Sequence, residues 1–203
     1  MSMRVVDWAG LSAGENVSET AAAGVAAKTA VTIGVFDGIH RGHRALIDKI
    51  AGKAPLLVPA VLTFRENPKK ITRSGTFEGD ILDYREKLRL FAALGVELCV
   101  VIDFSADFCK LGGREFFGMV YRSLRPAYAA VGFDFRCGFG LDTNAEAFRL
   151  LGEEHGVEVE IVPPVLAGGL PVSSSRIRAA LRAEDYAEAA SLLGRPAPVK
   201  HGG

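Results

Sequence analysis

The chain has 203 residues, and 49% of them are hydrophobic, a proportion typical of a folded globular protein that excludes extensive disorder. Its 24 lysines and arginines balance 24 aspartates and glutamates, so no overall charge draws it to nucleic acid or to an anionic membrane. No apolar run approaches the roughly 18 residues of a membrane-spanning helix. Three scattered cysteines lack metal-ligand spacing and are typical of reduced thiols, so we expect a cytoplasmic protein.

Apolar runs alternate with helical patterns along the chain. The predicted strands cover residues 3–8, 31–35, 56–64, 97–103, 128–135 and 157–162. The predicted helices cover residues 44–50, 84–94, 113–124 and 145–155, and another follows the serines at 173–175. This alternation predicts an α/β fold: a Rossmann-like, doubly wound parallel sheet of about five strands with a C-terminal helical appendage. The loops after such strands share one edge of the sheet, where ligands bind.

Three segments do not follow the alternation. Residues 65–80 have little apolar periodicity, and we expect a mobile loop over the ligand site. Residues 163–171 form a connection rich in proline and glycine. We expect residues 1–196 to form one domain and residues 197–203 to be a flexible tail.

The most informative motif follows the strand at 31–35, where glycines end the apolar run and two histidines precede a helix. A helix start presents unpaired N–H groups and a positive dipole end, both of which attract phosphate. His40 and His43 add donors that can follow charge as it develops there. We expect Asp37 to cap this helix as part of its role. As ordinary surface residues the histidines are less well explained, because the dipole disfavours their protonated form. The motif therefore predicts chemistry on a nucleotide phosphate.

A second motif consists of serines and arginines at the start of the last helical pattern. Taken alone, these serines would be good N-caps of a surface helix with two solvated arginines. Hydroxyls and guanidinium groups clustered at a helix start also form an anion clamp. Combined with the histidine motif, the clamp is the better interpretation.

Two strand ends provide the remaining candidates. The strand at 56–64 ends in Thr63 and Phe64, followed by Asn67 and Pro68, and the strand at 128–135 ends near Asp134 and Phe135. Phenylalanines at strand ends usually belong to the core. A carboxylate at the end of an apolar strand is either paired or directed at a ligand or metal.

In this order, the segments 34–43, 63–68, 131–138 and 173–178 resemble the FMN adenylyltransferase (FAD synthetase) module of bacterial bifunctional riboflavin kinase/FAD synthetases, within the HxGH nucleotidyltransferase superfamily. The resemblance extends from residue 3 to residue 196. It implies that residues 1–196 form an FMN adenylyltransferase-like domain and that the riboflavin kinase domain is absent. A separate riboflavin kinase chain is then a candidate source of FMN.

The resemblance implies that AMP passes from ATP to FMN, giving FAD and pyrophosphate. It implies Mg²⁺ bound mainly through the ATP phosphates, with no metal site made by the protein alone. Its implied catalytic residues are His40, His43 and Arg178. Its implied ATP-binding residues are Gly34, Val35, Phe36, Asp37, Gly38, His40, His43, Ser174, Ser175, Arg176 and Arg178. Its implied flavin-binding residues are Thr63, Phe64, Asn67, Pro68, Asp134 and Phe135.

Some positions depart from the family pattern, and all of them lie on the side of the site that is expected to hold FMN and its phosphate. Asn67 replaces a common histidine, Arg65 a common acidic residue and Cys137 a common phenylalanine, while the loop after Gly138 lacks a cation. Two alternatives therefore stay open. One is transfer of an adenylyl or cytidylyl group to another phosphorylated acceptor, and the other is a flavin- or nucleotide-binding module without catalysis.

Overall fold

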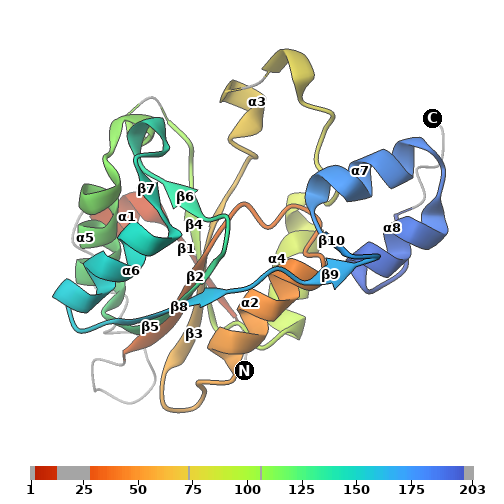
Figure 1. Ribbon diagram of the computed structural model, residues 1–203. Coiled ribbons are helices and arrows are strands. Elements are labelled where there is room, and N and C mark those ends of the chain that lie inside the picture. The colour runs from red at the N-terminus through yellow and green to blue at the C-terminus, as the bar shows by residue number, and fades with distance from the viewer. Residues whose placement is uncertain (1–2, 13–27, 73, 106, 199–203) are drawn as a thin grey trace.

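The computed structural model describes residues 3–12, 28–72, 74–105 and 107–198. Its centre is a six-stranded sheet, shown in Figure 1, in which every neighbouring pair of strands is parallel. The strands, in their order across the sheet, are β1 (Arg4–Asp7), β4 (Leu98–Ile102), β3 (Val58–Phe64), β2 (Thr29–Ile33), β5 (Pro126–Gly132) and β8 (Glu158–Val162).

Helices cover both faces of this sheet (Figure 1). One face carries α1 (Trp8–Ser12), α5 (Gly113–Leu124) and α6 (Ala145–Glu154), and the other carries α2 (Arg41–Ala51) and α4 (Tyr84–Ala93). Side chains of β2 alternate between the two faces: Val31 packs into the core that contains Phe148, and Ala30 into the core that contains Phe91. Burial on both faces explains the continuous apolar strands. The predicted doubly wound α/β fold is confirmed.

A helical appendage follows β8. It begins with a short hairpin of β9 (Leu166–Ala167) and β10 (Leu170–Pro171) and continues into α7 (Ser174–Arg182) and α8 (Tyr186–Leu193). Ile177 and Leu192 are fully buried in a separate apolar cluster that also contains Ile81. The appendage therefore packs against the segment that leads into α4. No helix in the described ranges has both the length and the apolarity needed to cross a lipid bilayer.

Several predicted boundaries were wrong. The leading strand expected at 3–8 is confirmed as β1, over residues 4–7, and its pairing with β4 brings the sheet to six strands against the expected number of about five. Helix α2 starts three residues before the predicted 44, and β5 ends three residues before the predicted 135 because the chain turns after Gly132. The predicted loop at 65–80 contains α3 (Lys69–Thr72) and η2 (Ser74–Thr76). The predicted tail lies mostly outside the described residues.

The remaining short elements lie between β4 and α6. They are η3 (Phe108–Lys110), β6 (Arg136–Cys137), η4 (Phe139–Leu141) and β7 (Thr143–Asn144), with β6 and β7 paired antiparallel.

The order of the strands places a ligand crevice at the carboxyl end of β2. The chain moves outward from β2 through β3 to β4 and then returns to place β5 on the other side of β2. Loops therefore diverge from the carboxyl ends of β2 and β5, and the space between them is the usual ligand site of such sheets.

Candidate active site

The histidine motif forms the turn between β2 and α2. His40 is the N-cap of α2, and its Nδ1 accepts the backbone N–H of His43 at 3.3 Å. The two imidazole rings stack with centroids 3.6 Å apart. Gly42 permits this stacking, because a Cβ there would lie 3.2 Å from His40 Cε1. Gly38, with φ of +91°, makes the tight turn before the helix.

Both histidines are neutral at pH 7. Burial, together with the nearby Arg195 guanidinium, lowers the pKa of His40 to about 4. Burial also holds the pKa of His43 well below its ordinary value, with contributions from His40 and Lys87. Since His40 Nδ1 accepts a hydrogen bond, its proton resides on Nε2, which is then a donor. The Nδ1 atom of His43 is buried without a hydrogen-bond partner among the described residues.

The loop before His40 is held from several sides. Gly34 N donates to Leu62 O in β3 at 3.0 Å. Phe36 is fully buried against Phe91 and the edge of His43, so only its backbone is available to a ligand. Arg195 donates to the carbonyl oxygens of Gly38 and Ile39, at 2.6 and 2.9 Å.

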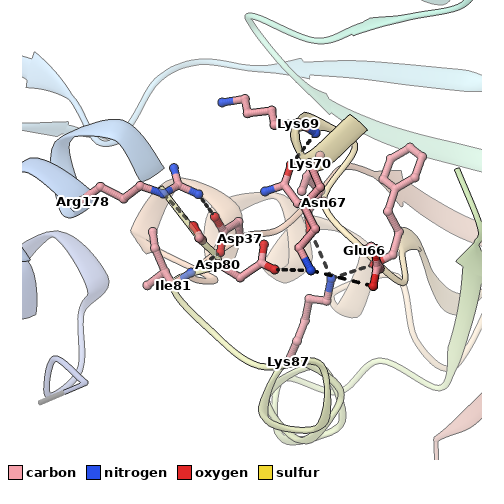
Figure 2. Close-up of polar contacts among 12 residues, drawn as sticks. Asp37, Glu66, Asn67, Lys69, Lys70, Asp80, Ile81, Lys87 and Arg178 are labelled. Carbon is pink, nitrogen blue, oxygen red and sulfur yellow. Dashed lines mark hydrogen bonds and ion pairs between the residues drawn. The ribbon is translucent and has the colours of Figure 1, made fainter. Parts of the chain in front are cut away.

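Asp37 does not cap α2, contrary to expectation, because His40 occupies that position. The Asp37 carboxylate instead accepts the Ile81 N–H at 2.8 Å and forms an ion pair with Arg178 of α7 (Figure 2). Asp37 is 6% exposed and the Arg178 side chain 11%. Burial raises the pKa of Asp37 above its ordinary value, while the Ile81 amide and Arg178 oppose that rise. This ion pair ties the histidine loop to the appendage.

The start of α7 faces the same site. Ser173 is the N-cap and accepts the Arg176 N–H at 3.3 Å, while the Ser174 hydroxyl donates to the Asp37 carbonyl at 2.7 Å. The Arg176 guanidinium donates to three carbonyls of the β9–β10 hairpin and pairs with Glu188 of α8 at 2.8 Å. Arg178 donates to the Gly79 carbonyl besides pairing with Asp37. Both arginines of the predicted clamp are therefore held by internal contacts.

Two helix starts and the end of β5 enclose a cavity of about 290 Å³. Its lining combines both histidines with the serines of α7, one lysine of α3 and the turn after β5. The lining residues are His40, Gly42, His43, Leu46, Lys69, Gly132, Phe133, Asp134, Val162, Pro163, Pro164, Val165, Pro171, Val172, Ser173, Ser174 and Ser175. We call it the histidine cavity. Two positive dipole ends and neutral imidazole donors suit a polyphosphate.

A larger cavity of about 500 Å³ lies beyond Asp37, at the carboxyl ends of β2 and β3. Figure 2 shows many of its polar side chains. Its lining residues are Val35, Asp37, Arg65, Glu66, Asn67, Lys70, Asp80, Leu82, Asp83, Tyr84 and Lys87. We call it the acidic cavity, because four carboxylates line it.

The structure does not gather the predicted flavin residues on one surface. Asn67 is buried in the lining of the acidic cavity, and its side chain accepts the Lys69 N–H at 3.1 Å. Asp134 is exposed and lines the histidine cavity instead. Thr63 lies beneath the loop, where its hydroxyl donates to the Val35 carbonyl at 3.2 Å.

The two phenylalanines of this set pack inward. Phe64 meets the edges of Phe104 and Phe108, and Phe135 meets Phe148. Pro68 is half-buried at the start of α3, where its carbonyl accepts the hydroxyl of Thr72.

Lys87 and Arg195 lie at the site but were not among the residues predicted from the sequence. Lys87 is buried in α4, four residues before the buried Phe91. A lysine on the apolar face of a helix was therefore the available signal. Arg195 gave no such signal, because its partners are backbone carbonyls more than 150 residues away.

The structure also shows the surroundings of two residues that depart from the family pattern, Arg65 and Cys137. Arg65 pairs with Asp7 of β1 and with Asp103 after β4. Burial raises the pKa of the half-buried Cys137 to about 12, so this thiol stays protonated. The described residues contain no group of three or more His, Cys, Asp or Glu side chains that could hold a metal ion.

A parallel α/β sheet with a stacked histidine pair at its switch point is typical of nucleotide-binding folds. The FAD synthetase family model matches residues 23–176, and the chain belongs to that family. The bifunctional riboflavin kinase/FMN adenylyltransferase of Escherichia coli strain K12 is 34% identical over 169 residues, which are 82% of this chain and 54% of that protein. The FAD synthetase of Listeria monocytogenes is 28% identical over 168 residues, 82% of this chain and 68% of that protein.

A solved structure supports the fold as well. It is described as a macrolide-efflux protein from Streptococcus pneumoniae and has a TM-score of 0.75 at 30% identity, over 98% of this chain and 64% of that one. The chain spans about half the length of the first curated relatives it matches.

Proposed function

We propose that this chain transfers AMP from ATP to FMN, forming FAD and releasing pyrophosphate. Membership of the FAD synthetase family supports this reaction. The observation that carries the proposal is the stacked, neutral His40–His43 pair in one cavity with the start of α7. This cavity is our proposed site for ATP, and the acidic cavity beside it, with Asn67, is our proposed site for FMN.

In this mechanism an oxygen of the FMN phosphate attacks the α-phosphorus of ATP in line. A new P–O bond forms, the bond from the α-phosphorus to the bridging oxygen breaks, and pyrophosphate leaves with the electron pair. A phosphate monoester is already an adequate nucleophile near neutral pH, so the protein needs to supply position and charge stabilisation. His40 Nε2 and His43 donate to the reacting phosphate oxygens.

The serine-arginine helix receives the departing pyrophosphate in this proposal. Ser174, Ser175 and the free N–H groups at the start of α7 contact it. Arg176 and Arg178 act mainly by holding this helix start against the hairpin and Asp37. We further propose that Mg²⁺ arrives bound mainly to the ATP phosphates, where it neutralises charge.

The proposed location is the cytoplasm, and the three thiols, none of them in a disulfide, support it. A separate riboflavin kinase chain remains the proposed source of FMN.

Incubation with ATP, Mg²⁺ and FMN, with FAD and pyrophosphate followed by chromatography, tests the reaction. We expect FAD from the wild type, a loss in kcat of about 10²- to 10³-fold in His43→Ala, and full activity in His155→Ala at the far end of α6. When pantetheine phosphate or nicotinamide mononucleotide replaces FMN as the acceptor, ATP should release no pyrophosphate. FMN binding without FAD formation would identify a non-catalytic module, and turnover of another acceptor would correct the substrate.

A further inference from the structure

Lys87 occupies an unusual position for a lysine. Its side chain rises from α4 to the floor of the acidic cavity (Figure 2), and the residue is only 8% exposed. The ammonium donates to Phe64 O at 2.8 Å and more weakly to Val35 O at 3.5 Å. These carbonyls end β3 and follow β2, so Lys87 joins the two strand ends between which an acceptor would lie. These contacts use two of the three N–H groups of the ammonium, and Lys87 lines the cavity.

The other charged groups that line the acidic cavity already have partners. Asp37 pairs with Arg178, while Lys70 lies 3.8 Å from Glu66 and 3.4 Å from Asp80. The remaining two also have partners: Arg65 pairs with Asp7 and Asp103, and Asp83 caps α4. In the described part of the chain, Lys87 is the lining cation that no carboxylate approaches within ion-pair distance.

A buried charge held only by carbonyl dipoles is costly to the protein. Burial accordingly lowers the pKa of Lys87, although Asp80 and Asp37 oppose that effect. An anion that entered the cavity would supply the missing opposite charge at a site that is already desolvated. Lys87 is also near enough to His43 for its charge to lower the pKa of that imidazole. An anion bound to Lys87 would therefore lie beside the histidine loop.

We propose that Lys87 binds the phosphate monoester of the acceptor and holds it as the nucleophile between the acidic and histidine cavities. This inference rests on the proposed function and assigns the acceptor-phosphate contact to a residue outside the predicted set. Lys87 forms no bond in the reaction. Its positive charge reduces the repulsion between the acceptor phosphate and the ATP phosphates, and its two carbonyl contacts fix its position.

Comparison of FMN with riboflavin isolates the contribution of the phosphate, because riboflavin lacks that group. Binding of each flavin to the wild type, Lys87→Met, Lys87→Gln and Lys87→Arg can be followed by flavin fluorescence. We expect Lys87→Met and Lys87→Gln to lose about 10- to 100-fold in FMN affinity, the usual effect of a charged hydrogen bond, with riboflavin affinity unchanged. Lys87→Arg should restore part of the FMN preference. Lys110→Met, which removes an exposed lysine elsewhere, should match the wild type.

Kinetics give a second readout. The KM for FMN should rise in Lys87→Gln while the KM for ATP stays the same, which a general loss of structure would not produce. Equal losses for FMN and riboflavin, or no loss for either, would overturn the inference.

The proposed function and this inference fail separately. A wild type that makes FAD, with a Lys87→Met variant that keeps its FMN preference, refutes only the role of Lys87. A wild type that makes no FAD but prefers FMN through Lys87 refutes only the reaction. A wild type that binds neither flavin refutes both.

Discussion

Acidification from pH 7 to pH 5 should destabilise the folded chain through His40 and His43, whose pKa values are both lowered in the folded state. An unfolded histidine takes up a proton near pH 6.5, whereas His40 in the folded protein does so only near pH 4. The unfolded state therefore binds more protons between these values, and stability falls as the pH falls. At about 1.36 kcal/mol per pH unit, His40 alone removes about 3 kcal/mol by pH 4, of which about 2 kcal/mol is lost by pH 5. His43 acts in the same direction.

Urea unfolding at pH 7, 6 and 5 measures this effect, with fluorescence of Trp8, the single tryptophan, as the probe. Trp8 is buried in the core beside α5, so its emission reports global unfolding. The variant His40→Asn keeps an N-cap acceptor but has no titrating ring. We expect its loss of stability between pH 7 and 5 to be smaller than that of the wild type by about 2 kcal/mol.

Ser173→Ala is the matched control, because it removes the N-cap of α7 without removing a titrating group. It should lower stability by about 1 kcal/mol at every pH. If His40→Asn and the wild type lost the same free energy between pH 7 and 5, the assignment of a neutral, buried His40 would be wrong.

Three further substitutions test other contacts. Asp37→Asn leaves the Arg178 guanidinium buried without its carboxylate and should cost about 3–5 kcal/mol, seen as a lower Tm. Arg195→Met removes two charge-assisted hydrogen bonds to the histidine loop; we expect a loss of about 2–3 kcal/mol and faster amide hydrogen exchange at residues 38–43. Gly138→Ala places a Cβ 2.4 Å from the Gly113 nitrogen at a φ of +82°, so it should cost about 2–5 kcal/mol in urea unfolding.

Each of these has a comparison that could contradict it. The double variant D37N/R178M should be more stable than D37N, because it removes the unpaired charge as well. Unchanged exchange in Arg195→Met would show that the loop does not depend on this residue. Gly140 has a φ of +65° and nothing within 4 Å of its ideal Cβ. The variant Gly140→Ala should therefore lower the free energy of unfolding by only about 1–2 kcal/mol.

Sequence periodicity was sufficient for elements whose burial is regular. The helix predicted at residues 113–124 is α5, because Phe116, Phe117 and Val120 mark one buried face. Boundaries were less accurate where capping decides them. His40 is not among the usual N-cap residues, and only the folded loop shows that its Nδ1 accepts the His43 amide.

Contacts between distant segments limited the prediction of the site. Asp37 and Arg178 are 141 residues apart, so the sequence could place both near phosphate without showing that they pair with each other. The phenylalanines at the strand ends followed the commoner pattern and joined the core. Local patterns thus identified the loops around the site, while the partner of each charged group became visible only in the folded chain.

The position of β1 has a consequence for how the chain is made. Arg4 pairs with Leu98, so the first strand to be synthesised must wait for a partner 94 residues later. At about 5–20 residues per second, that delay is roughly 5 to 20 s on the ribosome. Strands β2 and β3 are both made before Leu98 and pair with each other, so they can assemble during this interval. The amino-terminal strand is therefore a late addition to the sheet, and it covers the edge of β4 only after the rest of that side has formed.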